Sequence, residues 1–136
     1  MGKTFLTGLL AGVATVIINL ILTPLFNVVD PNLVTAYGTG VFRVESDPAK
    51  ILFWIFPFLM GIILAWVWTI VKPVFKGQIT SEQGVYFGLI IWLISIPDIF
   101  INYSSFPLPL LMIIGWSVMG GVEAIVAGLI FSKLLK

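Results

Sequence analysis

The sequence predicts an all-α integral membrane protein, a bundle of four transmembrane helices in one domain. Of its 136 residues, 60% are hydrophobic and 10% are charged, whereas a soluble domain is about half apolar and a quarter charged. Four apolar runs each have about the twenty residues that a helix needs to cross a bilayer. Small residues recur along these runs at helical spacing, which favours close helix packing in lipid. We expect spans near residues 4–26, 48–71, 82–103 and 109–133.

The composition excludes several functional classes. The chain has no Cys and no His, so it lacks the residues of disulfide relays and iron–sulfur clusters and the usual ligands of haem and zinc. A net charge of +1 gives no clustered basic face for nucleic acid. No phosphate-binding glycine loop or nucleophile motif is present. We therefore expect no cofactor, no metal site, no nucleic-acid partner and no catalytic activity.

The first span has features of a retained helix with a packing face. Lys3 stands before its apolar run, and no small-residue cleavage site follows the run, as a signal peptide would require. Gly8 and Gly12 form a G-x-x-x-G pair on a polar face that continues to Asn19. This pattern is typical of helix–helix contacts. Asn19 is expected to donate or accept an interhelical hydrogen bond, or to belong to a polar site inside the bundle.

Residues 27–47 form the longest connection between spans. Asp30 and the proline after it suit the start of a short helix that Gly38 ends. Residues 41–45 alternate weakly like a short strand. Asp47 and the proline after it repeat the capping pattern and predict the start of the second span.

The second and third spans each carry a sequence signal within or before the helix. Pro57 predicts a bend in the second span, because proline leaves a backbone carbonyl unpaired. Thr80 and Gln83 have the spacing of a capping box for the third span. On the third span, small and polar side chains share one helical face: Gly84, Gly88, Ser95, Asp98 and Asn102. We expect the glycines to pack against a neighbouring helix.

The fourth span carries an acidic residue, Glu123, near its middle. A carboxylate there costs roughly 2.5–3.5 kcal/mol on insertion scales, and no Lys or Arg lies in the interior of a span to neutralise it, since Lys50 and Lys133 stand at span ends. Glu123 is therefore expected to be protonated at rest. It is either a site that exchanges protons or cations, or a neutral acid that hydrogen-bonds between helices. A stripe of small residues lies on the neighbouring face: Ser117, Gly121, Ala124 and Gly128.

Five polar residues make up the candidate intramembrane site. If the bundle turns its polar faces inward, one internal column holds all of them: Asn19, Ser95, Asp98, Asn102 and Glu123. Asp98 lies near the end of its helix, so the alternative is that it is solvent-exposed and caps the segment after Pro97. We expect Trp92 and Trp116 to pack rather than to form an aromatic cage.

The basic residues predict the orientation of the bundle. Five lysines fall on one side of the predicted spans, at positions 3, 72, 76, 133 and 136, while Arg43 and Lys50 fall on the other. The positive-inside rule then puts both termini in the cytoplasm and residues 27–47 outside, in a multi-pass protein of a bacterial or archaeal plasma membrane.

The first and third spans both begin with paired glycines, and the second and fourth both have a central glycine. This predicts two hairpins related by an axis along the membrane normal.

Residues 84–133 contain a G-x-x-F-G-L opening, a proline-containing turn and a W…G…E…G fourth span. In these features the chain resembles the C-terminal half of small four-span bacterial membrane proteins that have no established activity. The resemblance implies the four-helix fold and no particular function.

Two functional classes follow from the sequence. The first is a non-catalytic membrane protein that acts through helix, lipid or partner contacts, as a homo-oligomer or with another membrane protein. The alternative is a small proton- or cation-coupled transporter or channel that uses Glu123, with Asn19 and Asp98, inside the bundle.

Overall fold

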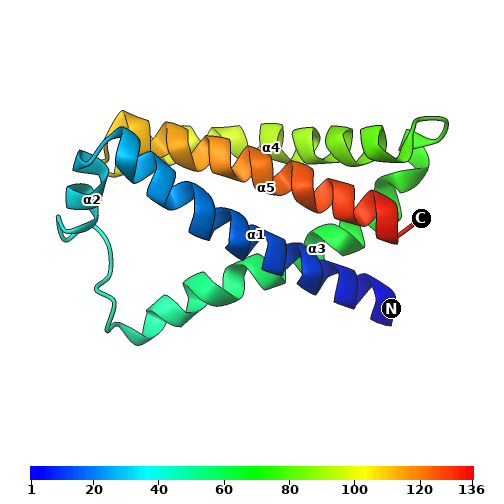
Figure 1. Ribbon diagram of the computed structural model, residues 1–136, viewed down its shortest axis with the longest axis horizontal. Helices are drawn as coiled ribbons and strands as arrows, with labels where there is room; N and C mark the ends of the chain where they lie inside the picture. Colours follow the sequence, from blue (N-terminus) through cyan, green and yellow to red (C-terminus); the bar gives the residue numbers. More distant parts are fainter.

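The computed structural model describes residues 1–136, and its only regular secondary structure is helical. Its four long helices are α1 (Gly2–Val29), α3 (Ile51–Val71), α4 (Thr80–Ser105) and α5 (Leu110–Leu134) (Figure 1). Each lies in a helical segment that is long and apolar enough to cross a membrane. The prediction of an all-α chain with four span-length helices is confirmed, and the helix ends lie within three residues of the predicted ones.

The surface of the molecule is largely apolar. Only 24 of the 136 residues are buried, and large hydrophobic side chains are exposed along all four long helices. Such a continuous apolar surface is rare in soluble monomers and suits contact with lipid. The four long helices therefore have the length and the surface of membrane spans.

The bundle has two ends, which we name by what lies there. The terminus end holds both chain termini and the short 3₁₀ helix η2 (Lys72–Phe75) that leads from α3 toward α4. The loop end holds the short helix α2 (Asn32–Tyr37), the 3₁₀ turn η1 (Pro48–Lys50) and the link between α4 and α5 (Figure 1).

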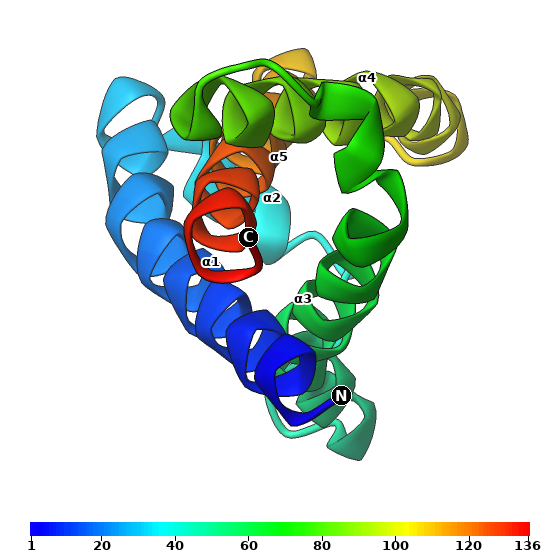
Figure 2. The same cartoon turned by 90° about the vertical axis from the view of Figure 1, so that its right-hand side faces the viewer.

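The four long helices form two pairs that α1 and α5 join. Helix α1 packs along α3, and α4 packs along α5, while the contact between α1 and α5 connects the pairs. Figure 2 shows the resulting order in space, α3–α1–α5–α4. Helix α3 touches α5 only sparsely and has no extensive contact with α4. The side between α3 and α4 is therefore the open side of the bundle.

Glycines bring the backbones of α1 and α3 together. A Cβ on Gly61 of α3 would collide with the carbonyl oxygen of Gly8 and lie 3.0 Å from the backbone nitrogen of Gly12. A Cβ on Gly12 would lie 2.8 Å from Cα of Phe58. Contacts this close exclude any side chain larger than hydrogen, as in other G-x-x-x-G interfaces.

The pair α4–α5 repeats the same arrangement. A Cβ on Gly128 of α5 would collide with the carbonyl oxygen of Gly84 and lie 3.2 Å from the backbone nitrogen of Gly88. In both pairs, a glycine on the second helix thus meets two glycines spaced by four on the first. The two helix pairs therefore share one glycine contact pattern.

The aromatic core lies at the terminus end. Trp68 stacks on Phe75 with ring centroids 5.8 Å apart and meets Phe87 edge to face at 5.2 Å. Phe87 in turn contacts Phe131 at 6.1 Å. These rings join α3, η2, α4 and α5, so they hold α3 against the rest of the bundle at this end.

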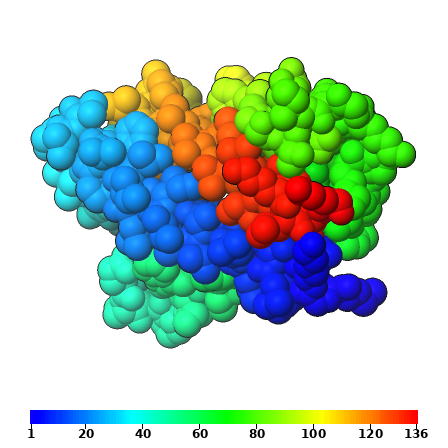
Figure 3. All heavy atoms as spheres, turned by 45° about the vertical axis from the view of Figure 1, so that its right-hand side comes forward, coloured from blue at the N-terminus to red at the C-terminus, as the bar shows by residue number.

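At the loop end, α3 diverges from α4 and α5. Figures 1 and 2 show the beginning of α3 well away from the other pair, and the segment leading into α3 projects as a lobe at the bottom of Figure 3. Pro57 lies in this diverging half of α3. The divergence leaves room beside α4 and α5 at the loop end.

Helix α2 folds back onto the loop end and covers α1 and α5. Pro31 occupies its N-cap position, and Oδ1 of Asp30, one residue earlier, accepts the backbone N–H of Asn32 at 2.9 Å. Leu33 and Ala36 are buried against α5 and the residues just before it. The predicted short helix in this connection is therefore present.

Two local predictions are wrong. Residues 41–45 form bends and a turn instead of a strand, because no neighbouring segment offers a partner for strand pairing. The expected capping box of Thr80 and Gln83 is also absent. Gln83 donates instead to the carbonyls of Phe75 and Gln78, and the Glu82 carboxylate accepts the backbone N–H of Ile79.

Both basic residues at the loop end are paired with acids. Arg43 Nη1 lies 2.7 Å from Asp47 Oδ2, and Lys50 Nζ lies 2.7 Å from Glu45 Oε1. The expected cap at Asp47 is present, since its Oδ1 accepts the backbone N–H of Ala49 at 2.8 Å. The hydrogen bonds from Arg43 and Ala49 hold the pKa of Asp47 below its ordinary value.

This lowered pKa predicts how the loop responds to acid. Because the pKa falls on folding, the stabilising contribution is present above the unfolded-state pKa and is lost as the pH falls through the folded-state pKa. We expect the carboxyl carbon of Asp47 to titrate in NMR at a lower pH than an unfolded aspartate. Arg43→Gln should raise that midpoint, whereas Lys50→Gln should leave it unchanged. An equal midpoint in wild type and Arg43→Gln would contradict the role given to Arg43.

Candidate functional site

The structure divides the five predicted polar residues into two sets. Asn19 and Glu123 meet between α1 and α5, whereas Ser95, Asp98 and Asn102 of α4 line a separate cleft. The expectation of a single internal column is therefore wrong. The physical reason is the divergence of α3, which leaves the polar residues of α4 facing an open space, while α1 covers a different side of α5.

The cleft lies at the loop end between α3, α4 and α5 and has a volume of about 300 Å³. One residue of α3, four of α4 and four of α5 line it: Phe56, Ser95, Asp98, Ile99, Asn102, Ile113, Trp116, Ser117 and Gly120. A Cβ placed on Gly120 would meet no other atom within 4 Å. The wall at Gly120 thus faces open space.

Trp92 marks the place where the close packing of α4 and α5 ends. Its indole ring lies over Gly121, and its Nε1–H donates to the carbonyl oxygen of Ser117 at 2.9 Å and to the Ser117 hydroxyl at 3.3 Å. Toward the terminus end the two helices touch through glycines. Toward the loop end, polar residues of α4 line the cleft.

The donors on the α4 wall are already engaged within the protein. Asn102 Nδ2 donates to the backbone carbonyl of Asp98 at 2.8 Å and to Asp98 Oδ2 at 2.9 Å. The hydroxyl of Ser95 donates to the carbonyl of Trp92 at 2.7 Å. The second carboxylate oxygen of Asp98 and the amide oxygen of Asn102 take part in no hydrogen bond within the protein, so this wall presents hydrogen-bond acceptors.

Asn19 and Glu123 connect the two helix pairs. Asn19 Nδ2 donates to Glu123 Oε1 at 2.6 Å and to the carbonyl of Thr15 at 3.1 Å. This is the interhelical hydrogen bond expected for Asn19, and it lies in the contact between α1 and α5. Glu123 comes three residues after Gly120, so it lies about one helical turn from the cleft wall toward the terminus end.

A pair of substitutions tests how this bond contributes to stability. Glu123→Gln keeps an oxygen that accepts from Asn19, so we expect the free energy of unfolding to stay within about 0.5 kcal/mol of wild type. Glu123→Leu removes the acceptor and should cost about 0.6–1.7 kcal/mol, the range for interhelical hydrogen bonds in membranes. Unfolding titrations in detergent micelles measure both. If Glu123→Gln were as costly as Glu123→Leu, the carboxyl group itself would be required.

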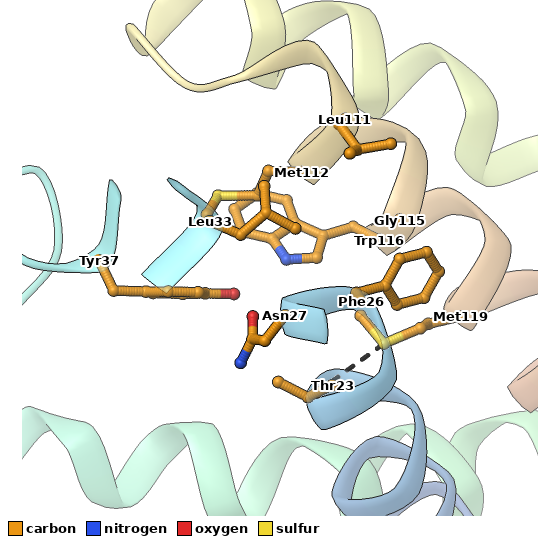
Figure 4. A pocket seen from close by; sticks show the side chains of 10 residues that line it. All are labelled: Thr23, Phe26, Asn27, Leu33, Tyr37, Leu111, Met112, Gly115, Trp116 and Met119. Carbon is orange, nitrogen blue, oxygen red and sulfur yellow. Dashed lines mark hydrogen bonds between the residues drawn. The ribbon is translucent and has the colours of Figure 1, made fainter. Parts of the chain in front are cut away.

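A second, much smaller cavity lies beside the cleft, between α1, α2 and α5 (Figure 4). Its volume is about 20 Å³, which is room for about one water molecule. In Figure 4 the indole nitrogen of Trp116 points toward Asn27 and Tyr37 across this space. Trp116 lines both cavities and packs edge to face on Phe42 at 6.1 Å. It therefore separates the small cavity from the cleft.

The structure also places the residues assigned to helix packing. Six glycines predicted from the sequence lie in close contacts between helices, at positions 8, 12, 84, 88, 121 and 128. Ser117 lines the cleft and accepts the indole N–H of Trp92.

Six lining residues of the cleft were not part of the predicted polar site: Phe56, Ile99, Ile113, Trp116, Gly120 and Ser117, the last of which had been assigned to helix packing. The apolar residues carry no chemical signal of their own, and a glycine facing open space has the same sequence pattern as one in a contact. Trp116 and Gly120 share a helical face with Glu123, and this was the only feature of the sequence that could have assigned them to the site.

Comparison with known proteins found no matching family model, no matching curated protein and no matching solved structure.

Proposed function

We propose that this chain is a non-catalytic integral membrane protein that binds the polar part of a membrane-embedded molecule in its cleft. The observation that carries the proposal is the cleft of about 300 Å³, which has polar side chains of α4 on one wall and Phe56 and Trp116 on the others. Polar groups are costly inside a membrane and are commonly found where a site or cavity uses them.

The shape of the cleft favours a lipid or a lipid-like molecule as its occupant. A volume of about 300 Å³ is at the lower limit of small-molecule sites, enough for a head group and too small for a whole lipid. The lack of extensive contact between α3 and α4 leaves the cleft's open side toward the surrounding bilayer. An alkyl chain could stay in the bilayer while the head group occupies the cleft.

We further propose that both termini lie in the cytoplasm of a bacterial or archaeal cell and that the loop end faces outward. The charge distribution supports this orientation. None of the five lysines of the terminus end forms a salt bridge, whereas Arg43 and Lys50 at the loop end are both paired with acids. Five of the seven basic residues lie at the terminus end, and the positive-inside rule, which counts Lys and Arg and not net charge, assigns that end to the cytoplasmic side.

Photolabelling in proteoliposomes tests the binding proposal. The probe is a phospholipid that carries a diazirine next to its head group, and mass spectrometry of peptides locates the labelled residues. We expect label to concentrate on the cleft-lining parts of α3, α4 and α5.

Gly120→Trp provides the matched variant, because its side chain would enter open space and fill the cleft. It should reduce the labelling of the cleft severalfold, while Val118→Trp, on an exposed part of the same helix, should not. Even labelling of all lipid-facing surfaces, unchanged by Gly120→Trp, would contradict the proposal.

Proton or cation coupling at Glu123 is the second candidate function. It is favoured by the position of Glu123 one helical turn from the open space at Gly120. Infrared difference spectra of wild type and Glu123→Gln in lipid test it. A carboxyl band that titrates between about pH 6 and 8 would show that Glu123 exchanges protons near neutral pH, as a coupling site requires. A band that stays constant across the whole accessible pH range would leave Glu123 as an interhelical contact.

A further inference from the structure

The hydrogen-bonding character of the cleft indicates which head group it binds. Resting on the proposed function, we infer that the cleft recognises the ammonium head group of a membrane amphiphile, with Asp98 as its counter-ion and Phe56 and Trp116 as its aromatic walls.

The polar wall presents more hydrogen-bond acceptors than open donors. The amide N–H groups of Asn102, the hydroxyl hydrogen of Ser95 and the indole N–H of Trp92 all donate within the protein. The Ser117 hydroxyl and the indole N–H of Trp116 make no such bond, and the Trp116 nitrogen points toward Asn27 and Tyr37 in the small cavity (Figure 4). Acceptors outnumber open donors, so the complementary ligand is a donor, as an ammonium group is and a phosphate or sulfate is not.

Asp98 has no cationic partner within the protein. No basic residue lies among the cleft-lining side chains, and the two basic residues at the loop end are engaged with Asp47 and Glu45. The remaining five belong to the terminus end. The protein therefore offers Asp98 no cation, and a carboxylate in this position favours one from a ligand.

The aromatic lining and the depth of the cleft also suit an ammonium head group. Phe56 of α3 and Trp116 of α5 line the cleft together with the polar residues of α4, and aromatic faces attract ammonium groups. Asp98 lies seven residues before the end of α4, which places it roughly 10 Å inside the helix end. A head group drawn slightly below the bilayer surface reaches this depth.

Competition for the photolabelled cleft tests the inference. Proteoliposomes with the diazirine phospholipid are titrated with increasing mole fractions of one of three amphiphiles: dodecylammonium, dodecyl sulfonate or dodecyl maltoside. We expect the ammonium compound to suppress cleft labelling at about a tenfold lower mole fraction than the other two, as an added contact with a carboxylate and an aromatic face allows.

Asp98→Asn should erase this preference, because the amide has a similar shape and no charge. Glu82→Gln, which removes an acid at the opposite end of α4, should retain it. If the cleft is labelled but all three amphiphiles compete equally, or if Asp98→Asn keeps the preference, the inference is wrong and the proposed function stands. If the cleft is not labelled at all, the proposed function itself fails.

Discussion

Replacing Trp68 by alanine is expected to lower the free energy of unfolding by about 3–5 kcal/mol, the range for removing a large buried aromatic side chain. Trp68 is 1% exposed and lies at the centre of the aromatic core. It contacts Phe75 and Phe87, and its Nε1–H donates to the carbonyl of Leu135 at 3.4 Å. Its loss would leave a cavity where α3 is held against α4 and α5, so α3 should separate from them first.

Unfolding titrations in detergent micelles measure this loss, and Trp66→Ala is the matched control. Trp66 lies on the same helix two residues earlier and is 61% exposed, so its replacement should change stability by less than about 0.5 kcal/mol. Equal effects of the two substitutions would show that the terminus-end core does not exist as described.

The second large effect is expected from a single methyl group at Gly128. Its Cβ would meet the carbonyl oxygen and carbonyl carbon of Gly84 and the backbone nitrogen of Gly88. These atoms belong to the backbone and cannot rotate away, so α4 and α5 must move apart. We expect Gly128→Ala to cost about 2–3 kcal/mol, within the range for overpacked interiors.

Gly120→Ala provides a control on the same helix, eight residues earlier. A Cβ at Gly120 meets nothing within 4 Å, and alanine has a helix propensity up to about 1 kcal/mol better than glycine. The same substitution should therefore be neutral or stabilising at position 120 and destabilising at position 128. A destabilising effect at both positions would mean that the space beside Gly120 is filled in the folded protein.

The four helices and their ends were predictable because a membrane span requires a fixed length of apolar chain. The short helix α2 was predictable for a different reason, since Asp30 and Gly38 carry local start and stop signals. The predicted strand at residues 41–45 failed because a strand depends on a partner segment. Thr80 and Gln83 failed as a capping box because Gln83 could donate to the carbonyls of Phe75 and Gln78 instead.

The helix contacts were predictable in part. Paired glycines at positions 8 and 12, and at positions 84 and 88, indicated packing faces, and these faces do carry close contacts. The sequence pattern does not tell which residue of the partner helix each pair meets. That depends on the relative shift and crossing of the helices, and Gly61 and Gly128 are known as partners only from the structure.

The arrangement of the polar residues could not be obtained from the sequence. Helical spacing placed Ser95, Asp98 and Asn102 on one face, and Asn19 and Glu123 near the middle of their spans. Which faces meet depends on the tilt of α3, and its divergence at the loop end creates the cleft that separates the two sets. No short-range pattern in the sequence encodes that tilt.

The most direct test of the account is the local polarity beside Gly120. The chain has no cysteine, so single cysteines at positions 120 and 118 can each carry a nitroxide label in lipid. The two positions differ in depth by about 3 Å at the helical rise, but position 120 faces the cleft and position 118 faces the exposed surface. The hyperfine splitting of the frozen spectrum reports the polarity around each label.

A polar cleft predicts a larger hyperfine splitting at position 120 than at position 118, and Asp98→Ala should reduce that difference. Equal splittings characteristic of hydrocarbon at both positions would show that no polar cleft exists between α3, α4 and α5 in the membrane.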